Sequence, residues 1–438
     1  MNRLIYSLVF YLVQPLIWCR LAWRARRQPD YLRHLGERYG FYLGRPTTPL
    51  LWLHAVSVGE TRAAEPLIKA LLADYPEHSL LLTHMTPTGR AVGAEFIGKY
   101  GERLLQAYLP YDLPDACARF LDHFKPRIGL LMETEIWPNL IAAANMRTLP
   151  VLLVNARLSA KSQRGYQRLL PLIRPTMKKL AVVAAQTSAD ASRLESIGAQ
   201  NIHVTGNLKF DVTPAAEKLQ LGADWRRALD GRPVWLAAST REGEEALILD
   251  AFARLYSLDR PDALLLLVPR HPQRFDEVAA LLEERKLTFC RRGSGQFPTP
   301  ETRVWLGDSM GEMPAYFALA DLALIGGTLL PFGGQNLIEA AACGCPVLVG
   351  PHTYNFTQAT EDALACGAAR RIADAGEAMQ TMKNLLADQA ALAAMREAAV
   401  AFSQAHRGAT ARTMALVREF IPAGRAASTK PASLHRLG

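Results

Sequence analysis

From about residue 50 onward, short apolar runs rich in Val, Ile and Leu alternate with longer stretches of helical period. A buried strand followed by an amphipathic helix, repeated along a chain, predicts a parallel sheet covered by helices. In the first half we expect strands at 50–56, 79–85, 104–110, 127–133, 151–157, 181–187 and 201–206. Helices are expected between them at 61–75, 87–98, 112–124, 136–146 and 187–199. The predicted fold class is therefore α/β.

The alternation starts again after a polar, helix-forming stretch at 212–230. Strands of the second half are expected at 232–240, 263–272, 287–292, 302–308, 322–328 and 345–350. A chain of 438 residues has room for two domains of ordinary size. We expect an anchor, two α/β domains and a flexible tail, with the bounds 1–28, 29–220, 221–421 and 422–438.

The N-terminal end carries a membrane signal. Residues 4–23 are apolar apart from Gln14 and Arg20, and a helix that crosses the hydrocarbon core needs about 20 such residues. Basic residues gather at its far end, at Arg20, Arg24, Arg26 and Arg27. By the positive-inside rule the bulk of the chain is expected in the cytoplasm. The flanking Trp and Tyr residues also suit a helix lying in the membrane interface, so a transmembrane helix and an interfacial anchor both remain open.

The composition limits the classes of ligand that we expect the protein to bind. The formal net charge of +9 predicts a surface that favours anionic ligands. We expect no nucleic-acid binding, because no Lys/Arg-rich run is interleaved with aromatic residues and no zinc-finger spacing occurs. The six cysteines are scattered without a CxxC pair, as expected for buried thiols in a reducing compartment. The sequence predicts no metal site.

In the second half, the segments after the strands point to an anionic ligand, because open α/β sheets bind ligands at the carboxyl ends of their strands. Arg270 and His271 follow the apolar run 263–269. The segment "LALIGGTLLPFGGQNLIEAAACGCPVLVG" places a glycine-rich loop between a strand and a helix. Asn336 begins that helix, where free backbone amides favour a phosphate, and Glu339 can accept hydrogen bonds from ribose hydroxyls. The loop is neither a Walker loop nor a dinucleotide fingerprint.

In the first half, the segment "HAVSVGE" puts Glu60 in a small-residue turn between a strand and a helix. Glu133 and Glu135 follow the strand at 127–133, and Lys209 lies near the end of this half. A mostly basic set follows the strand at 151–157, namely Asn155, Arg157, Ser159, Lys161, Ser162 and Arg164. Together these side chains predict a polar edge that holds an acidic acceptor or stabilises a charged transition state.

Seven motifs occur in order over nearly the whole chain: "HAVSVGE", "METEIWPN", "NARLS", "GNLKFD", "PRHPQRF", "GDSMGE" and "GGQNLIEAAACGCPVLVGPHTYNF". They resemble those of the transferases of Gram-negative lipopolysaccharide synthesis that move 3-deoxy-D-manno-octulosonic acid (Kdo) from CMP-Kdo to a lipid A precursor, lipid IVA. The resemblance implies a GT-B glycosyltransferase, with two Rossmann-like domains facing each other across a cleft. It further implies an inverting reaction without metal or cofactor, with CMP-Kdo as donor substrate, at the cytoplasmic side of the inner membrane.

The resemblance also assigns residues. Glu60 matches the general base, and Glu133 and Lys209 match residues that assist the transition state. For the CMP part of the donor it points to Arg270, His271, Met310, Gly311, Glu312, Asn336, Leu337, Ile338 and Glu339. Many members have a His before the Asn and a Pro-Leu pair after it, where this chain has Gln335, Leu337 and Ile338, so a role assigned to that His does not carry over.

Two alternatives remain open from the sequence. One is a GT-B transferase that uses another nucleotide sugar on a membrane lipid or glycan, and the other is a membrane-tethered nucleotide sensor without activity. The motifs do not indicate how many Kdo residues are added.

Overall fold

The computed structural model describes residues 2–258 and 262–422. These form two compact units, of which unit 1 comprises Met1–Asp211 with the chain from Gly408 onward, and unit 2 comprises Val212–Arg407. The division differs from the expected one, which placed the boundary at 220 and kept the chain up to 421 in the second domain. Most of the expected tail, 423–438, lies outside the described residues.

Unit 1 contains a parallel sheet of seven strands in the order β3-β2-β1-β4-β5-β6-β7. The strands are β1 (Leu50–His54), β2 (Ser79–His84), β3 (Leu104–Tyr108), β4 (Ile128–Met132), β5 (Val151–Ala156), β6 (Val182–Ala185) and β7 (Ile202–Val204). All seven expected strands are confirmed, each slightly shorter than expected. Alternate residues of the central strands pack into two separate apolar clusters, so that helices cover both faces of the sheet.

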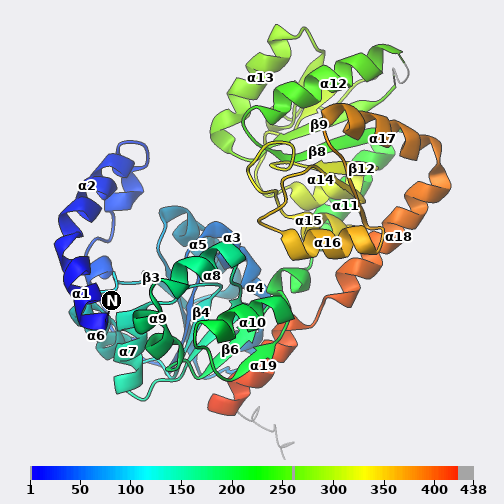
Figure 1. Ribbon diagram of the computed structural model, residues 1–438. Coiled ribbons are helices and arrows are strands. Elements are labelled where there is room, and N and C mark those ends of the chain that lie inside the picture. Colours follow the sequence, from blue (N-terminus) through cyan, green and yellow to red (C-terminus); the bar gives the residue numbers. More distant parts are fainter. Residues whose placement is uncertain (1, 259–261, 423–438) are drawn as a thin grey trace, which may run out of the picture. The chain divides into compact units, whose positions relative to one another are not determined.

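The helices of unit 1 lie between successive strands and at both ends of the chain (Figure 1). They are α1 (Arg3–Leu12), α2 (Gln14–Ala25), α3 (Val58–Ala63), α4 (Glu65–Asp74), α5 (Pro87–Tyr100), α6 (Pro114–Phe124), α7 (Pro138–Met146), α8 (Ala160–Gln167), α9 (Leu170–Met177), α10 (Ser188–Ser196) and α19 (Ala409–Phe420). The single helix expected at 61–75 is two helices, because Pro66 in the first turn of α4 cannot donate a backbone hydrogen bond to α3.

Unit 2 repeats the architecture with the strand order β10-β11-β9-β8-β12-β13-β14. Its strands are β8 (Val234–Thr240), β9 (Leu264–Pro269), β10 (Phe289–Arg291), β11 (Val304–Leu306), β12 (Leu322–Ile325), β13 (Val347–Val349) and β14 (Ala369–Arg371). Its helices are α11 (Ala216–Ala228), α12 (Glu244–Leu258), α13 (Phe275–Glu284), α14 (Met313–Leu319), α15 (Leu337–Ala342), α16 (Thr357–Ala365), α17 (Ala375–Ala387) and α18 (Gln389–Ala405). The expected α/β class is thus confirmed for both units, and β14 is an additional edge strand.

The C-terminal helix α19 belongs to unit 1. Met414 and Val417 lie in the same apolar cluster as residues of β1 and α4. The hydroxyl of Tyr75 donates to the carbonyl of Ile421 at 2.6 Å, and the Asp211 carboxylate accepts the N–H of Gly408 at 2.7 Å. The apolar face of α19 therefore completes the core of unit 1.

The expected N-terminal anchor helix is not a single helix. The pair α1 and α2 is bent by 49° at a short break, and within the described residues no single helix is long and apolar enough to cross a membrane. The bent pair together meets that test by length and composition only. Pro15 explains the break, because its ring cannot be accommodated inside a continuous helix.

Candidate active site

In unit 1, strand order reverses between β1 and β4. The chain leaves β1 toward β2 on one side and leaves β4 toward β5 on the other. The segments that follow the two strands therefore diverge at the carboxyl edge, where open α/β sheets bind ligands. Glu60 lies in the segment after β1, and Glu133 directly follows β4.

Glu60 lies in the first turn of α3, whereas the sequence predicted an irregular turn there. Ser57 is the N-cap of this helix, and its hydroxyl donates to Oε1 of Glu60 at 2.9 Å. The backbone N–H of Val56 donates to Oε2 at 2.8 Å. A Ser followed three residues later by a Glu is a known capping pattern of helix N-termini. These contacts fix the carboxylate beside the end of β1.

The surroundings of Glu60 favour its protonated form. Burial, and after it the charge of the nearby Glu133 carboxylate, raise the pKa of the Glu60 carboxyl to about 7, while the hydrogen bond from Val56 opposes the shift. General bases work best when their pKa lies near the operating pH. A carboxylate in this state is ionised in a large fraction of molecules at neutral pH and still has appreciable proton affinity.

Glu133 and Lys209 form an ion pair, with 3.5 Å between Oε1 and Nζ. Glu133 has a left-handed backbone with φ of 55°, a conformation that is uncommon for residues other than glycine and that is found at functional sites. Lys209 lies in the 3-10 turn Leu208–Asp211. The N–H of Leu208 donates to Oδ1 of the buried Asn155 at 3.0 Å, so the end of β5 holds the lysine segment in place.

Glu135, which the sequence placed at this edge, contacts two side chains that the sequence interpretation did not include. The indole N–H of Trp137 donates to Oε2 of Glu135 at 2.6 Å. The same oxygen lies 3.9 Å from Nε2 of His54, a fully buried ring. Burial raises the pKa of Glu135 and lowers the pKa of His54 to about 3. The carboxyl edge of unit 1 thus holds three carboxyl groups, at Glu60, Glu133 and Glu135.

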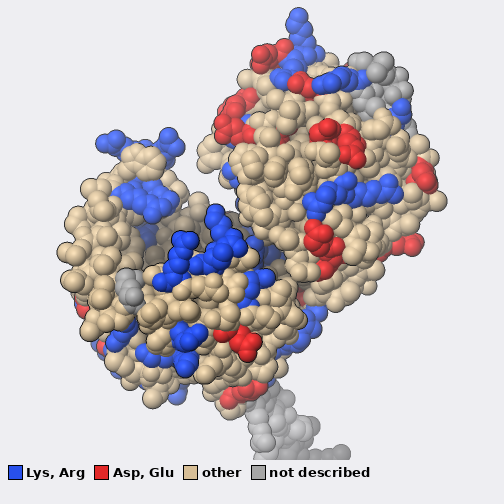
Figure 2. Space-filling view, in the orientation of Figure 1, with Lys and Arg blue, Asp and Glu red and all other residues tan. Residues whose placement is uncertain are grey.

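The polar and basic residues expected after β5 lie at the end of that strand and on the helix α8 that follows it. Ser159 is the N-cap of α8, where its hydroxyl accepts the N–H of Ser162. Lys161 and Arg164 lie on this helix and are exposed, and no residue of α8 is buried. Figure 2 shows basic side chains gathered on the face of unit 1 over α8 and at α2. The structure therefore presents these charges to solvent.

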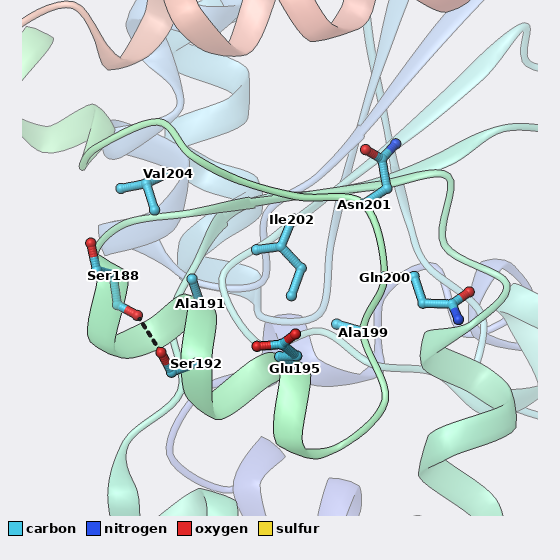
Figure 3. A pocket seen from close by; sticks show the side chains of 9 residues that line it. All are labelled: Ser188, Ala191, Ser192, Glu195, Ala199, Gln200, Asn201, Ile202 and Val204. Carbon is cyan, nitrogen blue, oxygen red and sulfur yellow. Dashed lines mark hydrogen bonds between the residues drawn. The ribbon is translucent and has the colours of Figure 1, made fainter.

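A surface groove of about 380 Å³ lies elsewhere in unit 1, between α10 and β7. Figure 3 shows its lining, which includes Ser188, Glu195 and Val204. The hydroxyl of Ser192 donates to the carbonyl of Ser188 at 3.1 Å on one side of it. β7 is the edge strand of the sheet, separated from β4 by β5 and β6. None of the residues expected at the active site lines this groove, and we assign it no role.

In unit 2, the segments expected to bind CMP follow strands that lie close together. The sheet contains β11, β9, β8 and β12 as successive neighbours. Met310–Glu312 follows β11, Arg270 and His271 follow β9, and the glycine-rich loop follows β12. The structure therefore brings the expected donor segments to one carboxyl edge, where strand order reverses between β8 and β12.

The glycine-rich loop needs glycine for steric reasons. A Cβ on Gly326 would lie 2.3 Å from the carbonyl oxygen of Ser239, at the end of β8, and Gly327 has φ of 71°. The side chain of Asn336 accepts the N–H of Ile338 at 3.2 Å and so caps α15. Glu339 is half-buried one turn on, while Leu337 and Ile338 are buried. Asn336 and Glu339 thus have the expected helical positions, and the two apolar residues between them pack inward.

The carboxylate of Glu312 accepts hydrogen bonds from other side chains of unit 2. The guanidinium of Arg292 donates to both of its carboxylate oxygens at 3.0 and 3.1 Å, and the hydroxyl of Ser309 donates at 2.6 Å. Gly311 has φ of 75°, and Met310 is 63% exposed. The carboxylate of Glu312 therefore stabilises the turn before α14, and the exposed part of this motif is Met310 and Gly311.

Arg270 and His271 lie beside further cations. Arg270 is half-buried, and its backbone N–H donates to the backbone carbonyl of Thr240 at 3.0 Å. His271 is exposed, and its pKa is lowered by partial burial and then by the charges of Arg241 and Arg270. Arg241 follows β8 and was not predicted, although "STREGEE" places a cation directly after an expected strand. In the described residues, no three His, Cys, Asp or Glu side chains are grouped as a metal site requires.

The sequence matches a family model described as 3-deoxy-D-manno-octulosonic-acid transferase (kdotransferase) over residues 33–212. The chain is 48% identical to the 3-deoxy-D-manno-octulosonic acid transferase of Bordetella pertussis over 433 residues, which are 96% of this chain and 100% of that protein. It is 39% identical to the enzyme of the same name from Haemophilus influenzae, over 82% of this chain and 84% of that protein.

Among solved structures, a glycosyltransferase from Rickettsia africae matches with a TM-score of 0.59 and 14% identity. The match covers 86% of this chain and 100% of that structure. At this level of identity the likeness concerns the fold alone.

Proposed function

The chain belongs to the Kdo transferase family and is a glycosyltransferase, and on this premise we propose that it moves Kdo from CMP-Kdo to a lipid A precursor with Glu60 as general base. The observation that carries the assignment of the base is the position of Glu60. Its carboxylate is held at the reversal point of a parallel sheet by Val56 and Ser57, and its pKa is raised to about 7.

The proposed reaction is a single displacement with inversion. A sugar hydroxyl of the acceptor attacks the anomeric carbon of Kdo, the bond from that carbon to the phosphate oxygen breaks, and CMP leaves from the opposite face. The hydroxyl proton passes to the carboxylate of Glu60, so the new glycosidic oxygen carries no positive charge at the end of the step. The phosphate oxygen of CMP keeps the electron pair of the broken bond, and Glu60 keeps the proton.

Lys209 and Glu133 assist this step in the proposal. The ammonium of Lys209 offsets the negative charge of the Kdo carboxylate or of the departing phosphate. Glu133 holds Lys209 through the ion pair and raises the pKa of Glu60 through its own charge. These two contacts give Glu133 a physical role, for which the sequence alone offered no argument.

The donor is proposed to bind at the carboxyl edge of unit 2. Arg270 and the backbone of the glycine-rich loop meet the phosphate, and Glu339 accepts hydrogen bonds from the ribose hydroxyls. The resemblance also assigns His271, Met310, Gly311, Glu312, Asn336, Leu337 and Ile338 to the CMP site. Because Glu312 is engaged by Arg292 and Ser309, we expect its motif to contact the nucleotide through Met310 and Gly311.

We further propose that α1 and α2 attach the enzyme to the cytoplasmic face of the inner membrane, where the lipid acceptor lies. Their large apolar side chains are exposed, among them Leu4, Leu8, Leu12 and Leu16 at 60–76%. The opposite side is docked on unit 1, where Tyr11 donates to Asp115 at 2.5 Å and Ser7 to Asn139 at 3.0 Å. Docking on one side and apolar exposure on the other support attachment along the membrane surface.

The reaction is tested with the full-length protein, CMP-Kdo and a tetra-acylated lipid A precursor, with products counted by mass spectrometry. We expect the acceptor mass to increase by one or more Kdo residues, and parallel incubations with UDP- and ADP-sugars to give no product. Transfer from one of those sugars, or no transfer from CMP-Kdo, would overturn the donor assignment. Flotation with anionic vesicles tests the membrane proposal, and a chain lacking residues 1–28 is expected not to float.

A further inference from the structure

One strand in the middle of the donor edge has no residue assigned to the donor. Of the four neighbouring strands β11, β9, β8 and β12, three are followed by segments proposed to bind CMP. The fourth, β8, lies at the reversal point and is followed by Arg241. We propose that Arg241 binds an oxyanion of the donor, an inference that rests on the proposed function.

The backbone of Arg241 is held by a buried carboxylate. Glu244, the first residue of α12, is fully buried, and its Oε2 accepts the N–H of Arg241 at 2.9 Å and the N–H of Gly327 at 2.6 Å. Its Oε1 accepts the N–H of Leu329 at 2.9 Å. One carboxylate thus ties the turn after β8 to the glycine-rich loop after β12. Because buried charges persist only where their hydrogen bonds are met, this arrangement fixes the two segments relative to each other.

The side chain of Arg241 lies against the same loop. Its guanidinium carbon is 4.5 Å from the centre of the Phe332 ring, which is a favourable cation–π distance. Its Cγ is 3.5 Å from the position that a Cβ on Gly327 would occupy, an ordinary contact distance, so the arginine stem packs against the glycine-rich loop. Arg241 is half-buried in this position. A guanidinium that stacks on a ring is held in one orientation, and the N–H groups at its edges can still bind a ligand.

Other arginines of this unit are engaged by acids, and Arg241 differs from them. Arg274 pairs with Glu245 and Glu277, Arg291 with Asp308, and Arg292 with Glu312. Within residues 212–258 and 262–407, no carboxylate lies within ion-pair distance of the Arg241 guanidinium. A half-buried guanidinium that stacks on an aromatic ring and has no acid beside it is suited to meet the charge of a ligand.

The donor carries two groups of matching chemistry. Both the phosphate of CMP and the carboxylate of Kdo present a pair of oxygens that a guanidinium fork can bind bidentately. A lysine has one point charge and cannot reproduce this geometry. The two sources of the oxyanion are separated by comparing CMP, which has only the phosphate, with CMP-Kdo, which has both groups.

The test uses full-length protein with Arg241→Gln and Arg241→Lys, and Arg254→Gln as the matched control. Arg254 is exposed on α12 and donates to the backbone carbonyl of Asp250, so the control removes one positive charge from the same unit. Calorimetry measures the Kd of CMP, and initial rates measure the KM of CMP-Kdo. Thermal unfolding checks that each variant is folded.

If Arg241 binds the phosphate, Arg241→Gln weakens CMP and CMP-Kdo alike, by about tenfold to a hundredfold, the range for a hydrogen bond to a charged group. If it binds the Kdo carboxylate, only the KM of CMP-Kdo rises by such a factor. Arg241→Lys is expected to fall between wild type and Arg241→Gln, and Arg254→Gln to match wild type.

A change below twofold in both measurements for folded Arg241→Gln and Arg241→Lys, with active wild type, would overturn the inference alone. Wild type that neither binds CMP nor uses CMP-Kdo would overturn the proposed function as well.

Discussion

The carboxyl edges of the two sheets have the same geometry and opposite charge. In unit 1 the reversal point between β1 and β4 holds Glu60 and Glu133, with Lys209 beside them. In unit 2 the reversal point between β8 and β12 holds Arg241, with Arg270 after the next strand. The parallel sheet therefore determines where a site can form, and the side chains after the strands set the role that we propose for it, proton removal in unit 1 and anion binding in unit 2.

The two edges also differ in the surroundings of one carboxylate each, Glu60 in unit 1 and Glu244 in unit 2. Glu60 accepts hydrogen bonds from one backbone N–H and one hydroxyl, lies beside other carboxylates and has a raised pKa. Glu244 accepts three backbone N–H groups at 2.9 Å or less. The hydrogen bonds of Glu244 hold two backbone segments together, whereas the raised pKa of Glu60 suits the proposed role of a general base. Four predictions test this distinction.

The largest effect is expected for Glu60→Gln. Gln is close in shape and can keep hydrogen bonds to Val56 and Ser57, but it cannot take a proton. Loss of a general base typically costs about 10² to 10⁴ in rate, so we expect kcat to fall by such a factor while the Kd of CMP is unchanged. Rates are measured with CMP-Kdo and the lipid acceptor. Glu102→Gln, which removes an exposed carboxylate of unit 1, is the control, and near wild-type turnover of Glu60→Gln would show that Glu60 is not the base.

Much of the fold of the two units was predictable from the sequence. The strands of both sheets were expected within a few residues, because buried parallel strands are nearly continuous apolar runs. β14 was missed because two of its three residues are exposed arginines at the edge of the sheet. α8 was missed because no residue of it is buried, so it has no apolar stripe of helical period. Apolar patterns in the sequence thus revealed the buried strands and missed these two exposed elements.

The site was predictable in part. Strand-end position singled out Glu60, Glu133, Lys209 and Arg270, and the family resemblance supplied their proposed roles. The partners of these side chains were not predictable, because hydrogen bonds between segments far apart in the chain have no local pattern. The contact of Glu244 with Leu329 joins residues 85 positions apart, and the Asn155 contact with Leu208 joins residues 53 positions apart. The left-handed backbone of Glu133 likewise has no sequence signal.

The next effect in size is expected for Glu244→Gln, which tests the structural carboxylate of unit 2. The amide keeps one acceptor oxygen but directs its NH₂ group toward N–H donors that need an acceptor. Such a mismatch of buried groups costs about 1–3 kcal/mol, so we expect a lower Tm and a KM for CMP-Kdo raised by about tenfold. Glu242→Gln changes an exposed carboxylate two residues away and is the control. A lower kcat with unchanged KM and Tm would contradict the distinction from Glu60.

A smaller effect concerns pH. A base with a pKa near 7 predicts that kcat/KM falls about tenfold per pH unit on the acid side of pH 7. Burial is the main cause of the raised pKa, and the charge of Glu133 is the next. Glu133→Gln removes that like charge and therefore lowers the pKa of Glu60. The acid limb of the profile is therefore expected at lower pH in Glu133→Gln and unchanged in Glu102→Gln. A limb that does not move would mean that the profile reports another group.

The smallest effect is on stability, and its sign separates the two carboxylates. The pKa of Glu60 rises from an ordinary 4.5 to about 7 on folding, so between these values the folded protein holds a proton that the unfolded chain has released. Stability therefore falls as pH rises through this window, and the loss is complete above pH 7. Glu60→Gln removes the loss and is expected to exceed wild type at pH 8 by on the order of 1 kcal/mol, with no difference at pH 4.

This stability difference is measured by thermal unfolding of wild type, Glu60→Gln and Glu244→Gln at both pH values. Glu244→Gln is expected to be less stable than wild type at pH 8, since its carboxylate is matched to N–H donors. Opposite signs for the same Glu to Gln change at two sheet edges would follow directly from their surroundings. If Glu60→Gln were also destabilised at pH 8, the helix-capping contacts of Glu60 with Val56 and Ser57 would outweigh its desolvation, and the carboxylate would be structural in both units.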